Sequence, residues 1–251
     1  MAKLDTLTLR VTDPEAQKRF YRTVMGMSDQ GGGRVGYSDR ETAIRFVAAD
    51  ASYAPEPTDL YWKIAVSVPD IELACAQLGA LGVTCTSPRQ FRDVGFLAKF
   101  ADPEGFTVEL IDHWFEGERP DLDIDRSILG GGAHLSLVTL RTGDIARIEH
   151  DILEWGMKKL SVQPVHPNGF TLYFYAFTEE TPPDPDLEAV ENRTWVYRRP
   201  YSVLEIQHVH ALDAETHPAA GAGGYAGLSI RTAGAPIRSE RLLIEGSATA
   251  A

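Results

Sequence analysis

Residues 137–157, LVTLRTGDIARIEHDILEWGM, carry the pattern that decides the fold. The stretch opens with a β-type apolar run and reaches Asp144, whose carboxylate can accept hydrogen bonds from the free backbone N–H groups of a helix's first turn. Ile148 and Ile152 follow at helical spacing, which predicts a helix with one buried face. Gly156 closes the stretch, at a position where a left-handed backbone favours glycine. A strand followed by a capped helix is therefore expected.

The same pattern occurs twice more in the chain. Residues 7–27, LTLRVTDPEAQKRFYRTVMGM, and residues 63–83, KIAVSVPDIELACAQLGALGV, repeat it, and strand-like segments follow each copy. A further copy opens at residues 225–232, YAGLSIRT, but AGAP follows where the capped helix should stand. The predicted fold is α+β, built from tandem βαβββ modules, with three complete copies and a partial fourth.

Module boundaries follow from the connecting segments. Residues 1–115 are expected to hold two βαβββ modules, and the polar stretch 116–132 reads as a linker. Residues 133–235 are expected to hold the third module and the first strand of the partial fourth. Residues 236–251 are expected to form a tail.

Composition excludes several classes of function. The 251 residues are 43% hydrophobic and 24% charged, with a mean hydropathy of -0.19, as in a soluble globular protein. A net charge of -12 argues against nucleic acid and anionic membranes as partners. No apolar run approaches the roughly 18 residues that a membrane span requires. With two cysteines and no secretory signal in sight, a cytoplasmic location is expected.

Two acidic residues occupy the middle of apolar strands. Glu109 lies in TVELI and Glu205 in VLEIQ, at matching positions of the second and third copies. Carboxylates are rarely buried unless they are paired or bind metal. Strand alternation sets each of them on the face opposite its aliphatic neighbours. The corresponding residue of the first copy is Arg45. The pair Glu109 and Glu205 is therefore a candidate site.

The tandem unit resembles the vicinal oxygen chelate superfamily, which includes glyoxalase I, extradiol dioxygenases and bleomycin- or fosfomycin-resistance proteins. The resemblance rests on the apolar-Arg-apolar-x-Asp openings, on FYRTVMGM (residues 20–27) and on DPEGFTVEL (residues 102–110). The third copy looks most like glyoxalase I, through EWGMKKLSV (residues 154–162) and TWVYRRPYSVLEIQHV (residues 194–209). In that fold two βαβββ units form an eight-stranded cup around a divalent metal.

The resemblance to glyoxalase I implies isomerisation of a thiol–2-oxoaldehyde hemithioacetal through a metal-stabilised enediolate, with glutathione as cosubstrate. Glu205 and Glu109 would be the catalytic base and the permanent metal ligand, in either order. His134, at the start of the third copy's first strand, would be a further ligand if a β-bulge brings its side chain to the face of the strand that carries the ligands. Zn, Ni, Mn and Fe(II) all suit such a donor set. Arg10 and Arg141 match the arginine that holds a glutathione carboxylate.

The sequence departs from this family at the first-strand ligand positions. Glyoxalase-like sites have His or Gln there, whereas this chain has Thr6, Lys63, Leu137 and, in the partial copy, Gly227. We expect Lys63 to contact substrate, but it could instead pair with Glu109, which would make the cup metal-free.

Two further functions therefore stand beside the isomerase. One is an extradiol-type, Fe(II)-dependent ring-cleaving dioxygenase, and the other is a metal-free protein that binds or sequesters a small molecule. All three act on a small molecule.

The copies can pair in two ways. If copies one and two close on each other, Thr6, Arg45, Lys63 and Glu109 meet in the cup. If copy two pairs with copy three, the cup gathers Lys63, Glu109, Glu205 and, with the bulge, His134, and we prefer this arrangement because it brings both carboxylates together. Copies left without a partner would then find one in a second chain, so a homodimer is expected.

Overall fold

Each repeat helix begins at its capping aspartate. The structure is a computed structural model that describes residues 2–121, 123–232 and 237–248. The three helices are α1 (Pro14–Thr23), α2 (Ile71–Ala80) and α3 (Ile145–Glu154). The carboxylates of Asp13, Asp70 and Asp144 accept hydrogen bonds from the backbone N–H group of the third residue of each helix, at 2.9, 2.7 and 3.3 Å. The predicted N-caps are confirmed.

The strands follow the helices in the expected order. The first repeat contains β1 (Lys3–Val11), β2 (Ser28–Asp29), β3 (Arg34–Gly36) and β4 (Ala43–Ala48). The second contains β5 (Tyr61–Val68), β6 (Arg89–Phe91), β7 (Gly95–Ala101) and β8 (Thr107–Asp112). The third contains β9 (His134–Thr142), β10 (Lys158–Val165), β11 (Phe170–Ala176) and β12 (Val203–Val209), with α4 (Glu191–Tyr197) before β12. The chain continues into β13 (Gly224–Thr232), β14 (Arg238–Ser239) and β15 (Ile244–Ala248).

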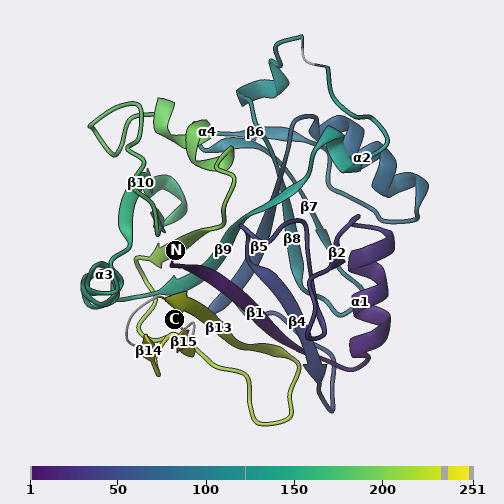
Figure 1. Ribbon diagram of the computed structural model, residues 1–251. Helices are drawn as coiled ribbons and strands as arrows, with labels where there is room; N and C mark the ends of the chain where they lie inside the picture. The colour runs from purple at the N-terminus through teal and green to yellow at the C-terminus, as the bar shows by residue number, and fades with distance from the viewer. Residues whose placement is uncertain (1, 122, 233–236, 249–251) are drawn as a thin grey trace.

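The strands form two curved sheets (Figure 1). The eight-stranded sheet has the order β10-β11-β12-β9-β5-β8-β7-β6, and the seven-stranded sheet has the order β14-β15-β13-β1-β4-β3-β2. Strands β5 and β9 are antiparallel neighbours, so the second and third repeats share one sheet. Strand β1 of the first repeat pairs with β13 of the same chain.

The segment 236–251, expected to be a tail, adds strands to the seven-stranded sheet in its described part. Strand β15 runs parallel to β13, with Ile244 opposite Leu228. Both of these side chains are buried, and this burial favours strand over free tail. Residues 233–236, which are the AGAP sequence, lie outside the described residues.

Strand alternation divides the apolar side chains of the eight-stranded sheet between two cores. On β5, Ile64 and Val66 belong to a large core that also holds Leu7 and Leu228 of the other sheet. Ala65 belongs instead to a second core inside the cup. On these strands, one face packs into the large core and the other face lines the cup. Glu109 and Glu205 were expected on the face opposite their aliphatic neighbours, which is the inner face of the cup.

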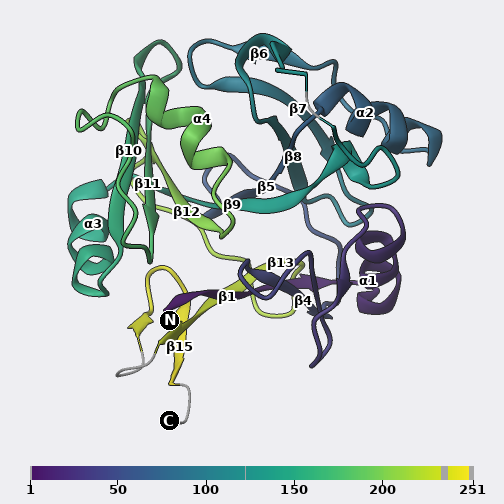
Figure 2. The ribbon, with the colours of Figure 1, turned by 45° about the horizontal axis from the view of Figure 1, so that its top comes forward.

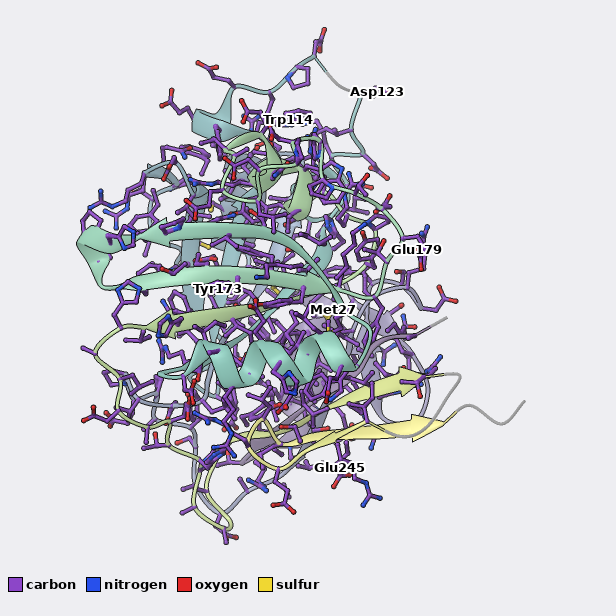
Figure 3. The ribbon with its side chains drawn as sticks, turned by 90° about the vertical axis from the view of Figure 1, so that its left-hand side faces the viewer. Met27, Trp114, Asp123, Tyr173, Glu179 and Glu245 are labelled. Carbon is purple, nitrogen blue, oxygen red and sulfur yellow. The ribbon has the colours of Figure 1, made fainter. Side chains whose placement is uncertain are left out.

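Helices cover the outside of the cup and close one end of it. Figure 2 shows α2 and α3 on the outer sides, while α4 lies across the opening between the strands of the third repeat and β7. Figure 3 shows α3 beside the strands of the third repeat, with Tyr173 on β11, and Glu245 on the strand pair below. Helix α4 is fixed by Arg193, whose guanidinium pairs with Asp93 at 2.7 Å.

Among the described residues, no helix combines the length and the apolar character needed to cross a membrane.

Candidate functional site

The eight-stranded sheet curves around a cavity of 280 Å³. Its wall combines charged and apolar side chains. The lining side chains come from β5 to β8, from the loops on either side of β6, and from β11, β12 and α4, and they are Trp62, Lys63, Thr86, Arg89, Phe91, Val94, Leu97, Ala98, Lys99, Glu109, Ile111, Phe170, Leu172, Tyr197, Glu205 and Gln207. This cup is the candidate functional site.

Polar side chains from five strands meet on the inner face of the cup. Glu109 on β8 lies opposite Lys99 on β7, and Thr139 on β9 lies opposite both Lys63 on β5 and Glu205 on β12. Between β8 and β5 the two groups are offset by two residues, because Glu109 is opposite Ala65. Because these strands are adjacent in the sheet, residues far apart in the sequence meet on one inner face. The two carboxylates expected to form a site are therefore brought together.

Lys63 joins the two carboxylates. Its Nζ lies 2.8 Å from Oε1 of Glu109 and 3.4 Å from Oε2 of Glu205, and it donates to Oγ1 of Thr139 at 3.1 Å. Lys99 holds the other oxygen of Glu109, with 3.0 Å between Nζ and Oε2. Lys63, Glu109 and Glu205 are almost fully buried, with 1%, 4% and 2% of their surfaces exposed. Such burial is tolerated because each charge has an opposite charge beside it.

The charges in this cluster set one another's pKa values. Burial disfavours the ammonium of Lys63, but Glu109 and Glu205 outweigh it and raise the pKa of Lys63 above its usual value. Burial also acts to raise the pKa of Glu109, but Lys63 and Lys99 reverse this and lower it. For Glu205, burial and the charge of Glu109 outweigh Lys63, so its pKa is raised. Lys63 thus stays charged, and Glu205 is the member of the cluster that takes up a proton most readily.

These residues do not fit a divalent metal. The ammonium of Lys63 lies where a metal bridging Glu109 and Glu205 would have to lie, and both oxygens of Glu109 are engaged by lysines. Within the described ranges, no three His, Cys, Asp or Glu side chains gather in a way that could hold a metal ion. Two carboxylates around a lysine suit instead the binding of polar groups or the transfer of a proton through Glu205.

His134 does not join the carboxylates, contrary to its expected role as a metal ligand. It begins β9, five residues before Thr139, which is about 16 Å along an extended strand at about 3.3 Å per residue. The register of β9 against β5 does shift between Leu135 and Leu137, so the bulge that we considered is present. The shift leaves the imidazole of His134 at the strand end, where Nε2 lies 3.0 Å from the carbonyl oxygen of Tyr197. Burial lowers the pKa of His134 to about 4.

The two arginines expected to bind substrate lie in different places. Arg10 is on β1, opposite Gly224 in the seven-stranded sheet, and does not line the cup. Arg141 is on β9 beside the cup, where its Nε donates to Oε1 of Gln207 at 2.9 Å. Its guanidinium carbon is 4.9 Å from the ring centroid of Trp62. Only Arg141 is therefore close enough to act on a molecule in the cup.

Sequence reasoning missed several residues of the site. Lys99, in the apolar strand sequence FLAKF, had the same signal as Glu109, namely a charge flanked by apolar residues. Thr139 gave no signal, because its role depends on the register of β9 against β5. Tyr197 comes from α4 and reaches across the cup, where its hydroxyl donates to the carbonyl oxygen of Val94 at 2.9 Å.

The sequence and the fold were compared with those of known proteins. Residues 3–110 match the family model of the Glyoxalase/Bleomycin resistance protein/Dioxygenase superfamily. No curated protein sequence gave a significant match.

Solved structures share the architecture at low sequence identity. Glyoxalase I from Zea mays superposes with a TM-score of 0.62 at 17% identity, over 92% of this chain and 74% of the other. A putative dioxygenase from Bacillus subtilis superposes with a TM-score of 0.53 at 14% identity, over 92% and 70%. Residues 3–110 thus match the model of the glyoxalase, bleomycin resistance protein and dioxygenase superfamily, and the chain as a whole has the vicinal oxygen chelate fold.

Proposed function

We propose that this protein binds a small organic molecule in the cup between its second and third repeats, and that it does so without a bound divalent metal. Of the three functions considered from the sequence, this is the metal-free member of the superfamily. The observation that carries the proposal is the ion pair of Lys63 with both Glu109 and Glu205.

The lysine replaces a metal in two respects. It supplies the positive charge that two buried carboxylates require, and it uses the oxygen atoms that a metal would need. A divalent ion would have to displace Lys63 into apolar surroundings, where an unpaired ammonium is costly. The isomerase and the dioxygenase both depend on an accessible metal, so the donor set favours them less.

The cavity itself has the character of a ligand site. Small-molecule sites are concave and mostly apolar, with a few polar groups that fix orientation, and they commonly measure about 300–1,000 Å³. The cup, at 280 Å³, lies near the lower end of this range. Phe91, Leu97 and Leu172 offer apolar contact, while Lys99 and Gln207 offer polar groups. A small, partly apolar molecule fits this wall best.

Metal analysis tests the first half of the proposal. Protein purified without chelator is expected to contain far less than one equivalent of any divalent ion, and added Zn²⁺, Ni²⁺, Mn²⁺ or Fe²⁺ should not raise its melting temperature. One tightly held equivalent, lost in the Glu109→Gln variant, would contradict the proposal.

Ligand binding tests the second half. A panel of small aromatic compounds, screened by calorimetry, should include binders whose affinity is lost in Leu97→Trp, because the larger side chain fills the cavity. Leu153→Trp is the matched control, since Leu153 is exposed on α3 and lies away from the cup. Binding that survives Leu97→Trp unchanged would place the ligand elsewhere.

A further inference from the structure

The charge of the cup is opposite to that of the whole chain. Three cationic side chains line it, Lys63, Lys99 and Arg89, against two carboxylates, Glu109 and Glu205. Arg141 stands directly behind this wall, hydrogen-bonded to the lining residue Gln207. The protein as a whole carries a net charge of -12. A local excess of positive charge in an acidic protein indicates selection by charge at this place.

The carboxylates of the cup are already satisfied, whereas some of its cations are not. Glu109 is paired with Lys63 and Lys99, and Glu205 is paired with Lys63. In the part of the chain that the structure describes, the guanidinium of Arg89 has no ion pair or hydrogen bond. Among the described residues, the guanidinium of Arg141 donates hydrogen bonds only to uncharged oxygens, namely Oε1 of Gln207 and the main-chain carbonyl oxygen of Glu56. The positive charge therefore remains available to a ligand.

Three of the cations lie around one aromatic ring. The Nζ atoms of Lys63 and Lys99 and the guanidinium carbon of Arg141 lie 4.9, 4.8 and 4.9 Å from the ring centroid of Trp62. Glu109 and Glu205 balance Lys63 and Lys99, so Arg89 and Arg141 supply the excess of positive charge. Arg89 lies on β6 opposite Leu97, which is two residues from Lys99 on β7, and both cations line the cavity. Because 39% of the Lys99 side chain is exposed, this lysine can also reach a ligand. The anionic part of a ligand would lie beside Arg89 and Lys99.

Much of the remaining wall of the cup is apolar. It includes Phe91, Leu97, Ile111 and Phe170, and Tyr197 of α4 also lines it while its hydroxyl is engaged by the carbonyl oxygen of Val94. With the hydroxyl so engaged, this part of the wall offers a ligand mainly apolar surface and calls for a hydrophobic, ring-sized body.

We propose that the ligand of the cup is a small organic acid with an aromatic or similarly flat apolar body. Its anionic group contacts Arg89 and Lys99, and its body lies against Phe91, Leu97 and Phe170. This inference rests on the proposed function, because it assumes that the cup binds a ligand.

Three naphthalene compounds of nearly equal shape test the charge of the ligand. They are 2-naphthoate, its neutral amide and 2-naphthylmethylammonium, each titrated into the full chain by calorimetry at low ionic strength. We expect the carboxylate to bind at least tenfold more tightly than the amide, and the ammonium to bind most weakly. Equal affinities, or tightest binding by the ammonium, would overturn this inference and leave the proposed function standing. No binding by any of the three, together with no hit in the aromatic panel, would overturn both.

Variants locate the anionic group. Arg89→Gln is expected to weaken naphthoate binding about tenfold, the loss of one charge-assisted contact, and to leave the amide unchanged. Arg19→Gln removes the same charge from an exposed position on α1 and is the matched control. Equal losses in both variants would mean that the affinity follows the overall charge, and would overturn the assignment of Arg89. Leu97→Trp should abolish binding of all three compounds.

Discussion

The clearest test of the cup's electrostatics is the replacement of Lys63 by methionine, which keeps the volume and removes the charge. The variant leaves Glu109 and Glu205 buried, and Glu205 without any cation within salt-bridge distance. Breaking a buried ion pair by removing one partner costs about 3–5 kcal/mol. Since unfolding free energies are typically about 5–15 kcal/mol, the variant should still fold, with a clearly lowered urea midpoint.

The pH dependence of this loss distinguishes a charge effect from a packing effect. Without Lys63, burial raises the pKa of Glu205 further above its unfolded value, whereas Glu109 keeps its ion pair with Lys99. A carboxyl group whose folded-state pKa is raised contributes most stability at low pH and loses it as the pH rises. The difference between wild type and Lys63→Met should therefore shrink as the pH falls from about 8 to about 5.

The matched control removes the two charges that Lys63 neutralises. The triple variant Lys63→Met, Glu109→Gln, Glu205→Gln should recover much of the lost stability, because no buried charge is left unpaired. A Lys63→Met variant as stable as wild type, or a loss that does not change with pH, would refute the account of Lys63 as the cation that balances the cup.

Three further predictions concern the frame around the cup. Asp102 joins the β7–β8 turn to α1 through Tyr21, at 2.8 Å, and burial raises the pKa of Asp102 to about 6. Because the folded-state value is the higher one, the wild type should lose about 2 kcal/mol relative to Asp102→Asn as the pH rises from about 4 to about 7, which urea unfolding at both values would measure; a constant difference would contradict this. Tyr197→Phe should cost about 1–3 kcal/mol and speed ligand release, seen by stopped-flow, because the carbonyl oxygen of Val94 loses its donor; an unchanged release rate would show that α4 does not close the cup. Asp70→Ala should destabilise the protein more than the roughly 1 kcal/mol expected for Asp144→Ala, because Asp70 also binds Arg119 at 2.7 Å. If the two variants lower the melting temperature equally, the Asp70–Arg119 ion pair does not contribute to stability.

The sequence by itself determined the local structure of this protein. The capping aspartates Asp13, Asp70 and Asp144 act through hydrogen bonds to residues three positions away, so a short stretch is enough to specify them. The inward direction of Glu109 and Glu205 likewise followed from alternation along a single strand. These features depend on a few consecutive residues, and the sequence displays those directly.

Only the tertiary structure decided what the two carboxylates do. Glu109 and Glu205 are 96 residues apart in the sequence, and they meet Lys63 because β5 and β9 become neighbours in one sheet. The same pairing sets the register that places Thr139 against Lys63 and leaves His134 at the far end of its strand. Register between distant strands is fixed by the packing of the whole core, and a shift of two residues would have preserved every local pattern while changing each of these contacts.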